Sequence, residues 1–115
     1  MSEPSQPPPH EPLFLRSADV QQKRPPSSFA DQPTRGKTTW YTLLTAPDTA
    51  TDTLTAGTAT CPANGSLALH CHAPAEIYYV QSGAGEVEIE RKRSKVGKDT
   101  VVWIPGDAEH GVFCG

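Results

Sequence analysis

The segment GSLALHCHAPAEIYYVQSG, residues 65–83, holds two short β-type runs separated by a proline. Alternate residues of a strand share a face, so His70 and His72 are expected to project together, with Cys71 on the other side. Glu76 follows after a short turn and is the next oxygen ligand within reach. Two imidazoles and a carboxylate at this spacing favour a divalent metal site.

Runs of β-branched and aromatic residues recur on both sides of this segment, with turn signals between them. No window shows a capped apolar period of about 3.6 residues that would predict a long helix. Strands recurring about every 8–12 residues predict an all-β sandwich or barrel. Trp103, inside the run Val-Val-Trp-Ile, is expected in its core. The expected strands cover residues 39–44, 52–60, 66–72, 76–80, 86–90, 100–104 and 111–114.

The first third of the chain has a different composition. Eight of the twelve prolines precede residue 34, whereas all nine glycines lie at residue 36 or beyond. This bias predicts an extended, mostly disordered arm over residues 1–35, followed by a β-barrel domain over residues 36–115. The apolar island at residues 13–20 is expected to be a strand that docks on a neighbouring subunit, or a loosely packed N-terminal strand.

Length and charge exclude several classes of protein. A chain of 115 residues forms one small domain at most. A net charge of -3 gives no basic field of the kind that attracts nucleic acid or anionic membranes. The apolar runs are far shorter than the roughly 20 residues that span a bilayer. The N-terminus shows no secretory signal, so a cytoplasmic location is expected.

The cysteines and the cationic residues do not by themselves indicate a specific function. The three cysteines lack a Cys-x-x-Cys pair, which argues against zinc ribbons and thioredoxin-type redox sites, and reduced thiols are expected. A single Cys61–Cys71 bridge remains geometrically open. Between residues 90 and 100 the sequence predicts a polar, solvated hairpin tip, with nuclear targeting or an anionic partner as the alternative. Its cations are Arg91, Lys92, Arg93, Lys95 and Lys98.

A second segment, GKDTVVWIPGDAEH at residues 97–110, supplies a third imidazole. Together the two segments resemble the paired motifs of the cupin superfamily, G(x)5HxH(x)3-4E(x)6G and G(x)5-7PxGxxH. The first motif is kept from His70 onward, but Gly65 stands one residue too close. The second keeps its proline-to-histidine spacing, with Asp107 in place of the usual glycine. The resemblance covers residues 38–115.

The resemblance implies a jelly-roll β-barrel, also called a double-stranded β-helix, that holds a divalent Fe, Mn, Ni or Zn ion. It implies an enzyme of dioxygenase, lyase or isomerase type acting on a small organic molecule, with Tyr78 as a candidate catalytic proton-transfer residue. Simple packing is the alternative for Tyr78. The alternatives for the protein are a non-catalytic ligand-binding or sensor cupin, or a remnant without metal. The implied metal ligands are His70, His72, Glu76 and His110.

The chain ends five residues after His110, where the family's barrel continues with at least one more strand. The sequence therefore predicts a barrel that is truncated at its C-terminal end. Three explanations remain open: a sequence cut short, a sheet completed by residues 13–20 of a partner subunit, or a decayed relative. Because an uncovered sheet edge invites pairing, a homodimer or marginal stability is expected.

Overall fold

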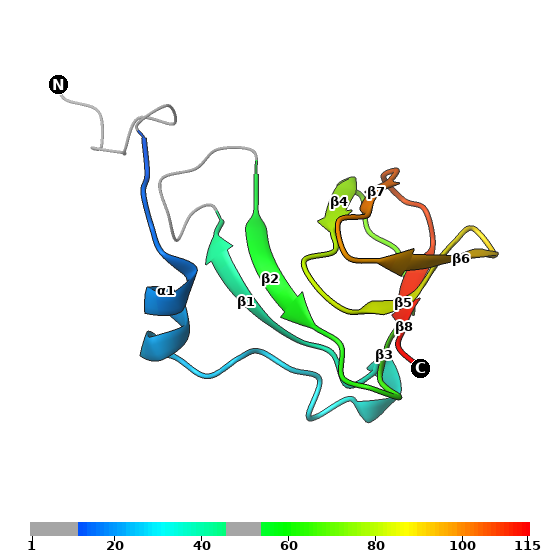
Figure 1. Cartoon of the computed structure of the whole chain (residues 1–115), viewed down its shortest axis with the longest axis horizontal. Coiled ribbons are helices and arrows are strands. Elements are labelled where there is room, and N and C mark those ends of the chain that lie inside the picture. Colours follow the sequence, from blue (N-terminus) through cyan, green and yellow to red (C-terminus); the bar gives the residue numbers. More distant parts are fainter. Residues whose placement is uncertain (1–11, 46–53) are drawn as a thin grey trace, which may run out of the picture. The chain divides into compact units, whose positions relative to one another are not determined.

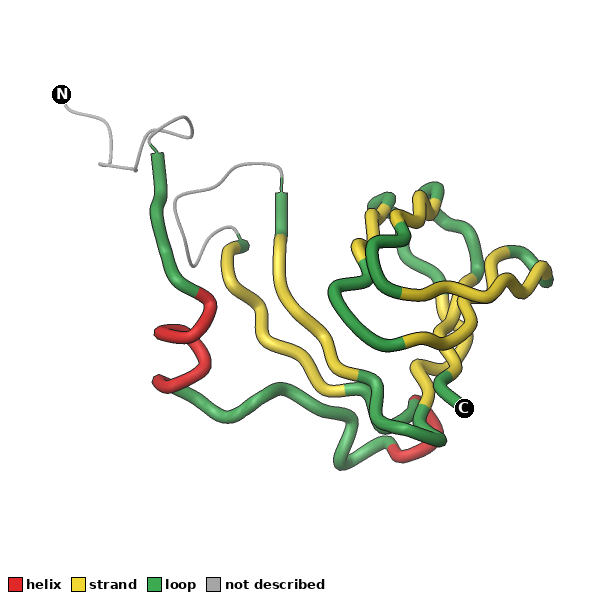
Figure 2. Tube along the Cα trace, in the orientation of Figure 1, coloured by secondary structure: helices red, strands yellow, loops and turns green. Residues whose placement is uncertain are grey.

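The computed structural model describes residues 12–45 and 54–115, which contain two short helices and eight strands (Figures 1 and 2). None of the described helices is long and apolar enough to cross a membrane. The helices are α1 (Ser17–Lys23) and the 3-10 helix η1 (Pro33–Arg35). The strands are β1 (Thr39–Leu44), β2 (Ala56–Thr60), β3 (Ser66–His70), β4 (Glu76–Tyr79), β5 (Ala84–Ile89), β6 (Lys92–Gly97), β7 (Val101–Ile104) and β8 (His110–Phe113).

The chain divides into two compact units. The described part of one unit comprises residues 12–27, 40–45 and 54–59, and contains α1 and most of the paired strands β1 and β2. The other unit comprises residues 28–39 and 60–115 and contains the remaining strands. The boundary expected between residues 35 and 36 stays a prediction.

Helix α1 replaces part of the strand expected over residues 13–20. Its sequence, SADVQQK, is mostly made of good helix formers, with Asp19 in the first turn and Lys23 in the last, where each complements the helix dipole. The helix ends at Arg24, which is extended because the following Pro25 disfavours the helical conformation. The prediction gave too much weight to the apolar residues before the helix and too little to the helix formers within it.

Residues 1–11 of the expected disordered arm lie outside the described residues, as does the start of the strand expected over residues 52–60. From residue 12 onward the arm has a defined backbone. The guanidinium of Arg24 donates a hydrogen bond to the carbonyl oxygen of Thr42, and Ser27 forms an antiparallel bridge with Trp40. These contacts join the segment after α1 to strand β1.

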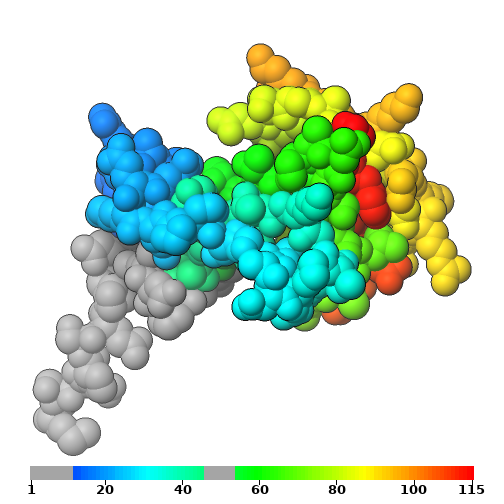
Figure 3. Space-filling model, turned by 90° about the horizontal axis from the view of Figure 1, so that it is seen from below, coloured from blue at the N-terminus to red at the C-terminus, as the bar shows by residue number. Residues whose placement is uncertain are grey.

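The second unit is built from two antiparallel sheets. One has four strands in the order β3-β8-β5-β6, and the other pairs β4 with β7. The chain crosses between the two sheets after β3, β4, β6 and β7, which is the pattern of a jelly roll. In Figure 3 the red C-terminal strand lies between green and yellow chain, as its central place in the larger sheet requires. The predicted all-β jelly-roll fold is confirmed.

The core of this unit is small and lies between the two sheets. Val87 of β5, Ile104 of β7 and Ala108 are its buried apolar residues among those described. The alternation along β7 turns Ile104 inward and leaves Trp103 largely exposed, so the expectation that Trp103 is a core residue is wrong. Four successive apolar residues give no alternation from which the inward side could be read.

Strand β6 occupies the region expected to be a polar tip. A tight turn at residues 90–91, both with positive φ, connects it to β5, as is typical of hairpins. Arg93 forms an ion pair with Glu88 at 3.1 Å, and its guanidinium lies 3.9 Å from the centroid of the Phe113 ring. Charged side chains suit an edge strand because they discourage further pairing. The solvated tip is therefore limited to the turn, and most of the cations lie on the strand.

Candidate metal centre

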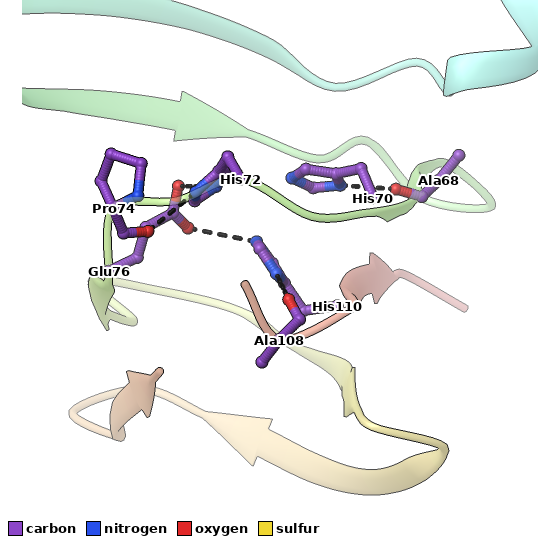
Figure 4. A network of polar contacts seen from close by, with 7 residues as sticks. All are labelled: Ala68, His70, His72, Pro74, Glu76, Ala108 and His110. Atoms are coloured by element: carbon purple, nitrogen blue, oxygen red, sulfur yellow. Dashed lines mark hydrogen bonds and ion pairs between the residues drawn. The ribbon is translucent and has the colours of Figure 1, made fainter. Parts of the chain in front are cut away.

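Three histidines converge inside the second unit. His70 ends β3 and His110 begins β8, and these two residues are directly paired across the antiparallel ladder. His72 follows in the loop after β3. Each of the three offers a ligand atom within 4.8 Å of the others, and the rings of His70 and His110 are 4.3 Å apart between centroids. Figure 4 shows the imidazoles turned toward one common point.

All three rings are oriented by the same kind of contact. In each ring Nδ1 lies 2.7–2.8 Å from a backbone carbonyl oxygen two residues away. Because a carbonyl oxygen only accepts hydrogen bonds, Nδ1 carries the proton of the neutral ring, and Nε2 keeps its lone pair. Such outer partners fix the tautomer of metal-binding histidines. The carbonyls belong to Ala68 for His70, Pro74 for His72 and Ala108 for His110.

Glu76, the first residue of β4, brings a carboxylate to the cluster. Its Oε1 lies 2.8 Å from Nε2 of His72, and its Oε2 lies 3.3 Å from Nε2 of His110 (Figure 4). The second contact is close enough for an ion pair, yet neither of its two buried atoms has a hydrogen-bond partner. In the neutral tautomer with the proton on Nδ1, His110 presents a lone pair toward a carboxylate oxygen, and two acceptors then face each other.

A cation between these atoms would satisfy both of them. Buried polar atoms without a partner are rare in folded proteins, and each one calls for a cause. Three imidazole nitrogens and a carboxylate form a donor set that suits divalent Fe, Mn, Ni or Zn. The residues present therefore fit a metal ion. The structure brings His70, His72 and His110 together and places Glu76 against two of them, while the role of Glu76 as fourth ligand stays a prediction.

Tyr78 lies beside Glu76 on the same face of β4. Its ring centroid is 6.3 Å from that of His110, and its hydroxyl hydrogen-bonds to the Glu76 carboxylate. Burial raises the pKa of the Tyr78 phenol, and the negative charge and hydrogen bond of Glu76 raise it further. The phenol is therefore protonated at neutral pH. The next residue, Tyr79, points outward and donates a hydrogen bond to Asp99 at 2.6 Å.

The turn before β8 positions the loop that carries His72. The backbone N–H of Asp107 donates a hydrogen bond to the carbonyl of His72 at 2.8 Å. A Cβ atom at Gly106 would collide with the carbonyl oxygen of Ala73, so only glycine fits there. Asp107 has a φ of 63° and occupies the place of the usual glycine, which aspartate tolerates better than most residues. The substitution at Asp107 therefore preserves the turn.

The sequence did not reveal the three backbone carbonyls that orient the rings. Ala68, Pro74 and Ala108 have side chains without polar groups, and their contribution depends only on the local path of the chain. Each carbonyl is two residues from its histidine, but that separation alone gives no signal. The direction of a carbonyl follows from backbone dihedral angles, which residue types only partly determine.

The two-sheet jelly roll with an inward histidine cluster defines a class: small β-barrel proteins with a candidate metal centre. A family model described as a cupin domain matches residues 57–114. The chain belongs to the cupin family. The predicted membership is confirmed, and the matched residues include the three histidines and Glu76.

Two comparisons place the chain among known proteins. It is 32% identical over 107 residues to "Dimethylsulfoniopropionate lyase DddW" of Ruegeria pomeroyi, a match that covers 93% of this chain and 67% of that protein. Its fold is similar to the crystal structure of a predicted oxalate decarboxylase from Thermotoga maritima. That likeness has a TM-score of 0.72 at 20% identity and covers 89% of this chain and 87% of the other. At this identity it concerns the fold alone.

Proposed function

We propose that this chain is a metal-dependent cupin enzyme of the lyase type, acting on a small carboxylate such as dimethylsulfoniopropionate. One observation carries the metal dependence: the buried atoms Glu76 Oε2 and His110 Nε2 lie 3.3 Å apart, and neither has a hydrogen-bond partner. The similarity to a protein named as a lyase favours elimination over the dioxygenase and isomerase chemistries that the fold also hosts.

The metal would be held by His70, His72 and His110 together with Glu76. A divalent ion there would supply Lewis-acid attraction for the carboxylate of a substrate. Elimination also requires a proton to leave the carbon beside the carboxylate as the substituent on the next carbon departs. With dimethylsulfoniopropionate the products would be acrylate, dimethyl sulfide and a proton, which balances the reaction.

Tyr78 is the proposed group for proton transfer. Its hydroxyl lies on the inner face of β4 and is held by Glu76, so it has one defined position in the site. The phenol is protonated at neutral pH, so its own proton must first pass to solvent, and the phenolate can then take the proton from the carbon beside the substrate carboxylate. The proposal makes Tyr78 catalytic and the histidines ligands.

Two further expectations accompany this function. We expect a homodimer in solution, which light scattering of the full chain would test. We also expect a cytoplasmic protein with a small-molecule substrate and no nucleic-acid partner. The reduced thiols expected in that compartment can be counted by alkylation in cell extracts.

Metal content is the first test. The wild-type protein is expected to purify with, or take up, about one divalent ion per chain. His72→Ala should retain less than about one tenth of that amount, because it removes a ligand whose ring is already oriented. Cys71→Ser is the matched control: residue 71 lies between two proposed ligands but is exposed and outside the cluster. Elemental analysis of the three proteins measures the difference.

Turnover is the second test. Metal-free protein reconstituted separately with Fe(II), Mn(II), Ni(II) or Zn(II) is incubated with dimethylsulfoniopropionate, and dimethyl sulfide in the headspace is measured by gas chromatography. The proposal expects sulfide release with at least one metal and none after chelation. Metal-loaded protein that binds small carboxylates without converting them would support the sensor alternative. Equal, negligible metal in wild type and His72→Ala would support the remnant without metal.

A further inference from the structure

Two cysteine thiols meet at the end of the jelly roll opposite to the histidines along strands β3 and β8. Cys61 precedes the turn that leads into β3, and Cys114 follows the last residue of β8. Both side chains are half-buried, and the Cys61 thiol lies near enough to that of Cys114 to raise its pKa. The metal site uses neither residue. Figures 1 and 3 show the red C-terminal end beside the green chain that enters β3.

The backbone fixes this proximity. The turn between Pro62 and Gly65 closes with a hydrogen bond from the Gly65 N–H to the Pro62 carbonyl at 2.8 Å. The carbonyl of Gly65 in turn accepts a hydrogen bond from the Cys114 N–H at 3.0 Å, which continues the β3–β8 ladder by one step. Cys61, directly before the turn, is thereby brought to the residue that follows β8.

The same geometry excludes the Cys61–Cys71 bridge that the sequence left open. Cys61 lies before the turn that leads into the N-terminal end of β3, and Cys71 lies directly after the C-terminal end of that strand. An extended strand advances about 3.3 Å per residue, so roughly 20 Å of chain separates Gly65 from Cys71. A disulfide needs Cα atoms within about 7 Å. Cys114 is therefore the only cysteine that Cys61 can reach within the described residues.

We propose that Cys61 and Cys114 form an oxidisable pair that closes into an intramolecular disulfide when the protein meets a low-molecular-weight disulfide such as oxidised glutathione. The bond would link the turn before β3 to the residue after β8. Because β3 ends in His70 and β8 begins with His110, the crosslink would clamp the two strands that present these histidines at their other end.

The exchange proceeds in two steps. The thiolate of Cys61 attacks one sulfur of oxidised glutathione, breaks its S–S bond and releases one glutathione thiolate, which takes up a proton. The thiolate of Cys114 then attacks the Cys61 sulfur of the mixed disulfide and releases the second glutathione. In total the two cysteines lose two electrons and two protons, and one oxidised glutathione becomes two reduced molecules.

Burial influences the order of these steps. Burial raises the pKa of Cys114 to about 11, with the neighbouring Cys61 thiol adding to the effect. Since a thiolate and not a thiol is the nucleophile, Cys114 reacts slowly with an oxidant from solution. Its attack on the Cys61 mixed disulfide is intramolecular, and the backbone pairing that brings Cys114 beside the Cys61 turn favours it. The pair should therefore react as a unit that begins at Cys61.

The test equilibrates the full-length protein in glutathione buffers of increasing oxidised fraction, alkylates the remaining thiols and maps the disulfides by mass spectrometry. No Lys or Arg lies between residues 38 and 90, so trypsin would leave Cys61 and Cys71 in one peptide. Chymotrypsin, which cuts after Leu67 or Leu69, separates them. The expected product is a Cys61–Cys114 crosslink at least tenfold more abundant than any crosslink to Cys71, with Cys71 alkylated.

A second measurement uses matched variants. Oxidation should raise the melting temperature of wild type and of Cys71→Ser, because the crosslink restricts the unfolded chain over more than fifty residues. Cys61→Ser and Cys114→Ser should show no such rise. Crosslinks that mainly involve Cys71, three alkylated cysteines at the highest oxidised fraction, or glutathione adducts that never resolve would each overturn the proposal.

Discussion

The two faces of the β4–β7 pair differ in burial: the inner side chains are buried or half-buried, and the outer side chains are exposed. On the inner face Glu76 and Tyr78 are half-buried, Tyr78 hydrogen-bonds to Glu76, and Glu76 reaches two histidines. On the outer face the Tyr79 hydroxyl donates a hydrogen bond to the exposed carboxylate of Asp99. The outer side chains are 61–67% exposed: Ile77, Tyr79, Val101 and Trp103.

This difference teaches that the position of a side chain relative to the histidine cluster follows strand alternation more closely than residue type. Tyr78 and Tyr79 are adjacent and chemically identical, yet one hydroxyl lies beside the histidine cluster and the other faces solvent. Ile77 and Ile104 likewise lie on opposite faces of one two-stranded sheet. The two-stranded β4–β7 sheet therefore provides matched pairs of positions, one inside and one outside, for experiments.

The tyrosine pair gives the largest expected effect. Tyr78→Phe removes the proposed proton-transfer hydroxyl and should lower kcat by about 10²–10⁴-fold. Tyr79→Phe removes only an exposed hydroxyl and should change kcat less than about twofold. Steady-state rates of sulfide release measure both, with metal content determined in parallel. Since neither hydroxyl is a proposed ligand, both variants should retain the metal.

Two results would break this part of the comparison. Equal activity in the two variants would show that Tyr78 only packs in the barrel, the alternative that the sequence left open. Loss of metal in Tyr78→Phe alone would assign Tyr78 a positioning role through Glu76, to which it is hydrogen-bonded.

The isoleucine pair gives the next effect, on stability. Ile104 is fully buried, and Ile104→Ala should cost about 2–5 kcal/mol of unfolding free energy because it leaves a cavity in a small core. Ile77 is 67% exposed, so Ile77→Ala should cost less than about 1 kcal/mol. Urea denaturation of both variants measures the difference. A large loss at Ile77 would mean that another surface covers the outer face in solution.

Sequence alone predicted which of these side chains lie close together better than it predicted their surroundings. His70, His72, Glu76 and His110 stand at fixed spacings that short local rules can detect, and the structure places them together. Strand β4 was also predictable, because the run that contains it begins after a proline break and is rich in β-formers. These features depend on residues that are close together in the sequence, so local sequence patterns were enough to predict them.

The remaining features depend on partners distant in the sequence. Strand β6 is cationic and is a strand because β5 pairs with it, so composition suggested a polar tip. Trp103 lies outside because its strand partner fixes which face is inward. Cys114 approaches Cys61 only through the pairing of β3 with β8. Local composition could not predict any of these three outcomes, since each is set by the register of a sheet.

The smallest expected effect concerns Asp99, the outer-face partner of Tyr79. Asp99 has a φ of 68°, a left-handed conformation that asparagine tolerates at least as well as aspartate. Asp99→Asn should therefore leave the unfolding free energy within about 0.5 kcal/mol of wild type. Asp99→Ala should lose roughly 1–2 kcal/mol, because alanine is strained at positive φ, and Asp99→Gly should recover part of that loss. Thermal denaturation of the three variants separates backbone strain from the Tyr79 hydrogen bond. If Asp99→Asn instead destabilised the protein as much as Asp99→Ala, the carboxylate on the outer face would contribute more to stability than the backbone conformation. The contrast between the two faces would then be weaker than the exposure of Tyr79 indicates.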